Sequence, residues 1–62
     1  MENWREREYL SVRDISRILQ IHFNTAYKLV KTLPHIKIGS TYRVSTEAFQ
    51  KWIRDQERAN RA

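Results

Sequence analysis

Asn24, Lys28 and Lys31 recur at helical spacing within "HFNTAYKLVKTL", residues 22–33, and fall on one side of the helix that this spacing predicts. The apolar residues of the same stretch fall on the other side. Lysine ammonium groups bind phosphate oxygens, and an asparagine amide can form paired hydrogen bonds with the edge of an adenine. The pattern therefore indicates chemistry directed at a nucleic acid.

The distribution of charge agrees with this interpretation. The chain has 62 residues, with 12 Lys and Arg against 7 Asp and Glu, and its net charge is +5. The whole excess lies between residues 11 and 44, where six basic residues stand against one acidic residue, Asp14. A positive surface of this kind is expected to meet polyanions.

Catalysis and metal binding lack the residues that they need. The chain has no cysteine, which excludes disulfides and thiolate metal sites. His22 and His35 have no carboxylate cluster beside them, and the sequence contains no nucleophile motif, glycine-rich phosphate loop or paired carboxylates. We therefore expect a protein that is not an enzyme and holds no cofactor or metal, with His22 capping a helix or contacting phosphate.

Two helices separated by a very short break must position these residues. Ser11 is a suitable N-cap for the first helix, with Asp14 in a variant of the capping box, and Pro34 ends the second. Two amphipathic helices joined by about three residues predict a helix-turn-helix with the second as recognition helix.

A third helix is predicted from Ser45 or Thr46, with Phe49, Trp52 and Ile53 as its buried stripe. Beyond Ile53 the apolar stripe ends and charges alternate. We expect the core to be complete at Ile53 and the remainder to be a solvated extension.

Between these helices, "HIKIGSTYRV", residues 35–44, predicts a β-hairpin around Gly39. A loop of three residues, 39–41, would put the apolar side chains of both strands on one face and would pair Ile36 with Val44, Ile38 with Tyr42 and Lys37 with Arg43. The paired cations would repel each other in the free protein but could straddle a phosphate backbone.

Four motifs in "YLSVRDISRILQIHFNTAYKLVK" and "IKIGSTYRVSTEAFQKWI" carry a resemblance to a known family. They are a Leu-Ser helix start, a Thr-x-Tyr in the recognition helix, an apolar-basic strand ending in Gly, and a Phe-x-x-Trp in the closing helix. Over residues 9–53, about three quarters of its length, the chain resembles the small excisionase and MerR-like winged-helix DNA-binding proteins. The resemblance implies an α+β winged helix-turn-helix with a two-stranded wing. It also implies the role of an excisionase, which binds and bends DNA beside attachment sites and helps an integrase to excise a prophage or mobile element.

The resemblance adds Thr25 and Tyr27 to the recognition helix, although Tyr27 could equally belong to the core. The chain departs from the family at Phe23 and Asn24 and at the wing tip, where relatives carry basic residues. The predicted DNA-binding residues are Arg17, His22, Asn24, Thr25, Tyr27, Lys28, Lys31, Lys37, Ser40, Thr41 and Arg43.

Residues 1–8 are expected to form an N-terminal arm, 9–53 the winged-helix domain and 54–62 a helical extension or tail. The expected partners are double-stranded DNA, further copies of the chain bound cooperatively on neighbouring sites, and an integrase contacted by the tail. A small MerR-like transcriptional regulator and a protein-interaction module such as an antirepressor remain alternatives. The sequence contains no recognisable membrane span or signal peptide, so we expect a cytoplasmic, nucleoid-associated protein of a bacterium or phage.

Overall fold

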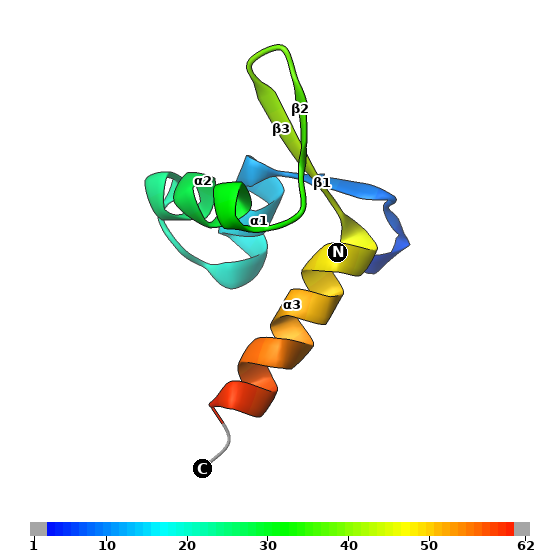
Figure 1. Cartoon of the computed structure of the whole chain (residues 1–62), viewed down its shortest axis with the longest axis vertical. Coiled ribbons are helices and arrows are strands. Elements are labelled where there is room, and N and C mark those ends of the chain that lie inside the picture. The colour runs from blue at the N-terminus through cyan, green and yellow to red at the C-terminus, as the bar shows by residue number, and fades with distance from the viewer. Residues whose placement is uncertain (1–2, 61–62) are drawn as a thin grey trace.

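The computed structural model describes residues 3–60 and has the architecture of a winged helix-turn-helix (Figure 1). Its elements in chain order are the 3-10 helix η1 (Trp4–Glu6), β1 (Tyr9–Ser11), α1 (Val12–Leu19), α2 (Phe23–Thr32), β2 (Ile36–Ile38), β3 (Thr41–Ser45) and α3 (Thr46–Ala59). Helices α1 and α2 form the helix-turn-helix, and the β2–β3 hairpin is the wing. The α+β fold class predicted from the sequence is confirmed.

Local hydrogen bonds fix where α1 begins and how it turns into α2. The Ser11 hydroxyl accepts from the Asp14 N–H at 3.0 Å, and the Asp14 carboxylate accepts from the Ser11 N–H at 3.0 Å, so the predicted capping box is present. Gln20 ends α1 in the left-handed conformation, with φ 56°. The Ser16 hydroxyl then donates to the Ile21 carbonyl at 2.6 Å, which ties the turn back onto α1.

The sheet has three antiparallel strands in the order β1-β3-β2, one strand more than the sequence predicts. Leu10 of β1 lies opposite Val44 of β3, and both side chains are fully buried. The Thr46 N–H donates to the Glu8 carbonyl at 2.9 Å, and the Thr46 hydroxyl donates to the Arg7 carbonyl. The chain before α1 is therefore joined to the start of α3.

The predicted register of the wing is wrong. The observed partners are Ile36 with Arg43, Lys37 with Tyr42 and Ile38 with Thr41. Only Gly39 and Ser40 form the loop, and Gly39 has φ +61° while Ser40 does not have a positive φ. A positive φ at the first loop residue alone is the pattern of the type II′ turn, which suits two-residue hairpins and favours glycine at this place.

The new register separates the two cations of the wing. Lys37 shares a face with Tyr42, and Arg43 lies on the opposite face, so the expected repulsion between Lys37 and Arg43 does not arise. Ile36 and Ile38 share the face of Arg43 and are 45% and 65% exposed. Tyr42 and Val44 of β3 therefore pack against the core, and the two isoleucines of β2 do not.

Among residues 3–60, eight apolar side chains form the buried core, contributed by β1, the three α-helices, β3 and the residue after α2. Phe49 is fully buried, as predicted, and stacks on Trp52 with 6.2 Å between ring centroids. Trp52 itself is only partly buried at the margin. Trp4 also contacts Phe49, edge to face, with 5.4 Å between ring centroids.

Helix α3 projects away from the sheet and from α1 and α2, and residues 54–60 are exposed (Figure 1). Within residues 3–60, no helix combines the length and the apolar character needed to cross a membrane.

Candidate nucleic-acid interface

The exposed side chains of α2 are basic or neutral, and none is acidic. Ala26 and Val30 are buried against the core, which fixes the rotation of the helix about its axis. Asn24, Lys28 and Lys31 consequently lie on the exposed side. The surface therefore offers one amide and two ammonium groups to a partner.

His22 is the N-cap of α2. Its ring Nδ1 accepts a hydrogen bond from the Asn24 N–H at 3.1 Å. A neutral ring that accepts at Nδ1 carries its hydrogen on Nε2, so the exposed imidazole keeps one donor for another group. This contact also fixes the backbone of Asn24 at the first turn of the helix.

An aromatic contact joins α2 to the wing. The rings of Tyr27 and Tyr42 meet edge to face with 5.2 Å between centroids. Two ammonium groups cover this pair, Lys31 over Tyr27 at 4.6 Å and Lys37 over Tyr42 at 5.8 Å, both measured from Nζ to the ring centroid. The hydrogen-bonding side chain of Tyr42 raises the pKa of Tyr27, so Tyr27 is a neutral phenol at neutral pH.

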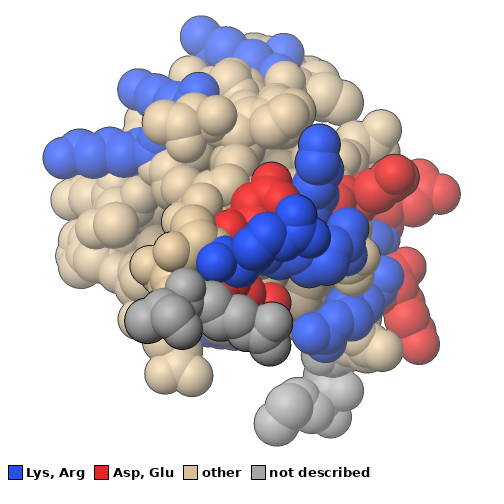
Figure 2. All heavy atoms as spheres, turned by 60° about the horizontal axis from the view of Figure 1, so that its bottom comes forward, with Lys and Arg blue, Asp and Glu red and all other residues tan. Residues whose placement is uncertain are grey.

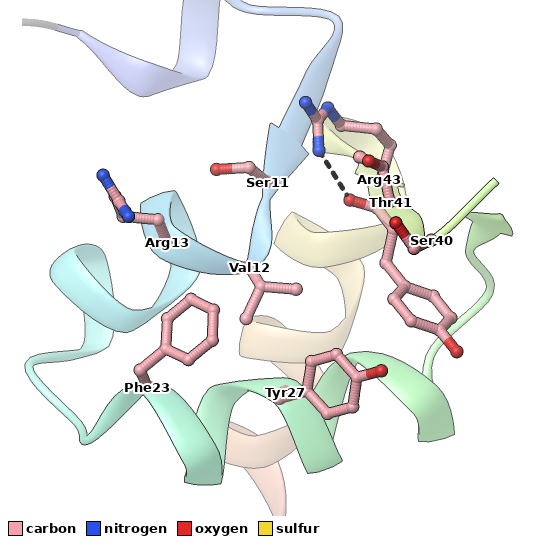
Figure 3. A pocket seen from close by; sticks show the side chains of 9 residues that line it. Ser11, Val12, Arg13, Phe23, Tyr27, Ser40, Thr41 and Arg43 are labelled. Atoms are coloured by element: carbon pink, nitrogen blue, oxygen red, sulfur yellow. Dashed lines mark hydrogen bonds between the residues drawn. The ribbon is translucent and has the colours of Figure 1, made fainter. Parts of the chain in front are cut away.

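An open hollow of about 400 Å³ lies where the start of α1, the start of α2 and the wing meet (Figure 3). Its lining comes from Ser11, Val12, Arg13, Phe23, Tyr27, Ser40, Thr41, Tyr42 and Arg43. In Figure 3, Arg13 and Phe23 border one side of the hollow, and Ser40, Thr41 and Arg43 border the other. The hollow thus combines aromatic side chains with hydroxyl and guanidinium groups along its edges.

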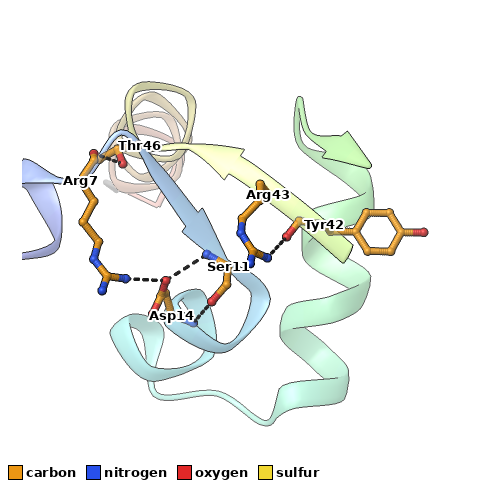
Figure 4. A network of polar contacts seen from close by, with 6 residues as sticks. All are labelled: Arg7, Ser11, Asp14, Tyr42, Arg43 and Thr46. Carbon is orange, nitrogen blue, oxygen red and sulfur yellow. Dashed lines mark hydrogen bonds and ion pairs between the residues drawn. The ribbon is translucent and has the colours of Figure 1, made fainter. Parts of the chain in front are cut away.

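Polar contacts beside the hollow neutralise the one acidic residue of the basic segment (Figure 4). Arg7 donates to the Asp14 carboxylate at 2.9 Å. Burial tends to raise the pKa of Asp14, but hydrogen bonds from Ser11 and the charges of Arg7 and Arg17 outweigh it, and the pKa is held below its ordinary value of 3.8. On β3, Arg43 Nη1 donates to the Tyr42 carbonyl at 2.9 Å, which holds its guanidinium close to the strand.

Acidic side chains are concentrated away from α2. Figure 2 looks onto the end of the molecule that carries α3, and there red Asp and Glu side chains are mixed with blue Lys and Arg. On the left, the side on which Figure 1 places α2, blue side chains stand without red ones between them. On the face drawn in Figure 2, the positive charge is therefore less compensated on the side of α2 than on the side of α3.

The structure brings only part of the predicted site together. Tyr27, Ser40, Thr41 and Arg43 line the common hollow. Asn24, Thr25, Lys28 and Lys31 are exposed on α2 next to it. Lys37 lies on the opposite face of the wing from Arg43, and Arg17 lies in the last turn of α1, outside the lining of the hollow.

Arg13 and Phe23 line the hollow but are absent from the sequence-based set. Arg13 directly follows the first residue of α1, and the start of that helix faces the wing in Figure 3. Phe23 is the first residue of α2, directly after the N-cap His22. The sequence feature that could have indicated Arg13 is its position, because it is the second residue of a helix whose start is marked by the N-cap Ser11.

No group of three or more His, Cys, Asp or Glu side chains in residues 3–60 is arranged to hold a metal ion.

One family model, described as "Helix-turn-helix domain", matches residues 9–57, which is most of the chain. No curated protein and no solved structure matches the chain.

Proposed function

The chain belongs to the helix-turn-helix domain family of small DNA-binding domains, and from this premise we propose that it is an excisionase that binds and bends attachment-site DNA. The observation that supports the DNA-binding part of the proposal is the hollow of about 400 Å³ between α2 and the wing, with exposed cations on the adjacent surface. The family supports sequence-specific DNA binding, and its members are typically not enzymes. The excision role is our inference from the resemblance of residues 9–53.

Helix α2 would enter the major groove with Asn24 toward the base edges, as recognition helices do with their first residues. Lys28 and Lys31 would then neutralise phosphates beside the groove, and Arg43 would hold the backbone at the wing. These contacts fix register and orientation, and the amide supplies sequence information.

A single module of this size has a small footprint, since one such domain buries roughly 600–1,000 Å² of protein surface on DNA. Excision would therefore use several copies on neighbouring sites, each adding to the bend. The exposed end of α3 is available to contact an integrase or the next copy, because residues 54–60 do not pack against the domain core.

Co-expression with the integrase of the same mobile element tests the proposal. We expect the chain to raise the yield of excised circle and to lower integration, with the yields measured by amplification across the two junctions. The Lys28→Ala/Arg43→Ala double variant should lose the effect, and Lys51→Ala, a cation on α3 away from the hollow, should keep it. Unchanged recombination combined with repression of a nearby promoter would identify a regulator instead.

A further inference from the structure

Phe23 is a large apolar side chain placed on a basic surface without a place in the core. It is 46% exposed, whereas Ala26 and Val30 of the same helix are buried. Tyr27 and Leu29 of the same helix pack against the buried cluster, and Phe23 does not belong to that packing. The fold therefore gives no reason for a phenylalanine here.

The position of Phe23 within α2 is that of a residue that meets base pairs. It is the first residue of the helix, directly after the N-cap His22 and before Asn24. Tyr27 follows one turn later on the same side of α2, and its ring contacts Tyr42 of the wing. The rings of Phe23 and Tyr27 both border the hollow (Figure 3). Recognition helices contact base edges with their N-terminal residues.

A phenyl ring can recognise only one feature of the major groove. Three of the four bases present only hydrogen-bonding groups there, whereas thymine adds its C5-methyl group. A phenyl ring has no donor or acceptor atom, so it gains nothing from the hydrogen-bonding groups. It gains apolar burial when it packs against the thymine methyl group. We infer that Phe23 is a specificity-determining residue that packs against the C5-methyl of a thymine, next to the base pair contacted by Asn24.

This inference rests on the proposed DNA binding and adds a base preference to it. A ring that packs on deoxyribose instead would contribute affinity to every sequence equally. The two contacts can be separated, because replacing thymine with uracil removes the methyl group and leaves base pairing and backbone unchanged.

The experiment begins with selection of a preferred duplex from a randomised library by the wild-type chain. Each thymine of that duplex is then replaced by uracil, one at a time, and the Kd is measured for wild type, Phe23→Ala and Tyr9→Ala. Tyr9 is a matched control, since it is 47% exposed on β1 and does not line the hollow. Circular dichroism of each variant verifies that it is folded.

We expect at least one uracil substitution to weaken wild-type binding about fourfold, the effect of one buried methyl group. Tyr9→Ala should show the same loss, and Phe23→Ala should bind the thymine and uracil forms of that position equally. Equal binding of all uracil forms by the wild type overturns the inference, and so does an unchanged loss in folded Phe23→Ala. Absence of any duplex binding would instead overturn the proposed function itself.

Discussion

The ring of Tyr27 on α2 meets the ring of Tyr42 on β3 edge to face, with 5.2 Å between centroids and 90° between planes. The pair joins the recognition helix to the wing, and His35 adds a second edge-to-face contact to Tyr42 at 5.3 Å. Because Lys31 and Lys37 cover the two rings, the same contact also positions two cations. The geometry of the candidate interface therefore depends on an interaction within the protein.

A double-mutant cycle of Tyr27→Leu and Tyr42→Leu should show this coupling. We expect the two changes to be non-additive by about 0.5–1.5 kcal/mol in the free energy of unfolding, the usual strength of an aromatic pair. Urea unfolding of the four proteins measures it. The pair Tyr9→Leu and Tyr42→Leu serves as control and should be additive, and additivity in the Tyr27 cycle as well would contradict the coupling.

Asp14 should make stability depend on pH in the acid range. Its pKa is lower in the folded protein than the ordinary 3.8, so the folded state binds the proton less readily than the unfolded state. The stabilisation is thus complete above the ordinary pKa and is lost as the pH falls through the folded pKa. We expect Asp14→Asn to be less stable than wild type by about 1 kcal/mol near neutral pH, and the difference to shrink below about pH 4.

Thermal unfolding of both proteins at a series of pH values measures this difference. Glu47→Gln, a change of an exposed acid in the first turn of α3, is the control for the general effect of losing one carboxylate. A difference between wild type and Asp14→Asn that stays constant down to the lowest pH would contradict the role of the ionised Asp14.

Phe49→Ala should unfold the domain at room temperature. The ring is fully buried and contacts both Trp4 and Trp52, and removing a buried aromatic costs about 3–5 kcal/mol, close to the whole stability of a small domain. Far-UV circular dichroism with and without urea decides it. Trp52→Ala is the comparison and should retain a cooperative unfolding transition, since Trp52 is only partly buried. If Phe49→Ala unfolds near the urea midpoint of the wild type, this description of the core is wrong.

The helices could be predicted from the sequence because their signals are local. Ser11 with Asp14 marks a helix start within four residues, and Pro34 stops the chain from continuing as a helix. The wing register could not be predicted by the same reasoning, which assumed that all apolar residues share a buried face. Tyr42 and Val44 are held by partners distant in sequence, Tyr27 and Leu10, and Ile36 and Ile38 remain on the exposed face.

The candidate site divides in a similar way. Asn24, Lys28 and Lys31 could be placed on one exposed side of α2 because helical geometry relates residues along a single element. Arg13 and Phe23 join the hollow only through the angle between α1, α2 and the wing. That angle follows from packing between elements, for which no local pattern exists.

Asn24 and Lys28 should differ in the kind of binding energy that they contribute. Asn24→Ala should lose discrimination at one base pair, worth about 1–3 kcal/mol for a bidentate contact, and Lys28→Ala should weaken binding to all duplexes and lower the salt slope by about one. Titrations of a selected duplex and its single-base variants at several salt concentrations measure both effects. Lys51→Ala is the control, and an equal loss on every sequence for Asn24→Ala would remove Asn24 from the residues that read bases.

The last turns of α3 should serve association and leave single-site binding unchanged. Arg54 and Arg58 are one turn apart on an exposed side of the helix, beyond the residues that pack on the core. The double change Arg54→Gln/Arg58→Gln keeps the helix and removes two charges. We expect nearly wild-type affinity for one isolated site, but loss of cooperative filling of neighbouring sites or of integrase recruitment.

Gel-shift titrations on one-site and multi-site duplexes, with and without integrase, separate these effects. Asp55→Asn/Glu57→Gln is a matched control, because it removes two charges of opposite sign from the same exposed turns. Loss of cooperativity in the arginine variant alone would assign the contact to an acidic surface on the partner, since only the positive charges would then be needed. If the arginine variant matches wild type on every duplex and with integrase, the end of α3 has no part in assembly, and copies of the protein must cooperate through the DNA that they bend.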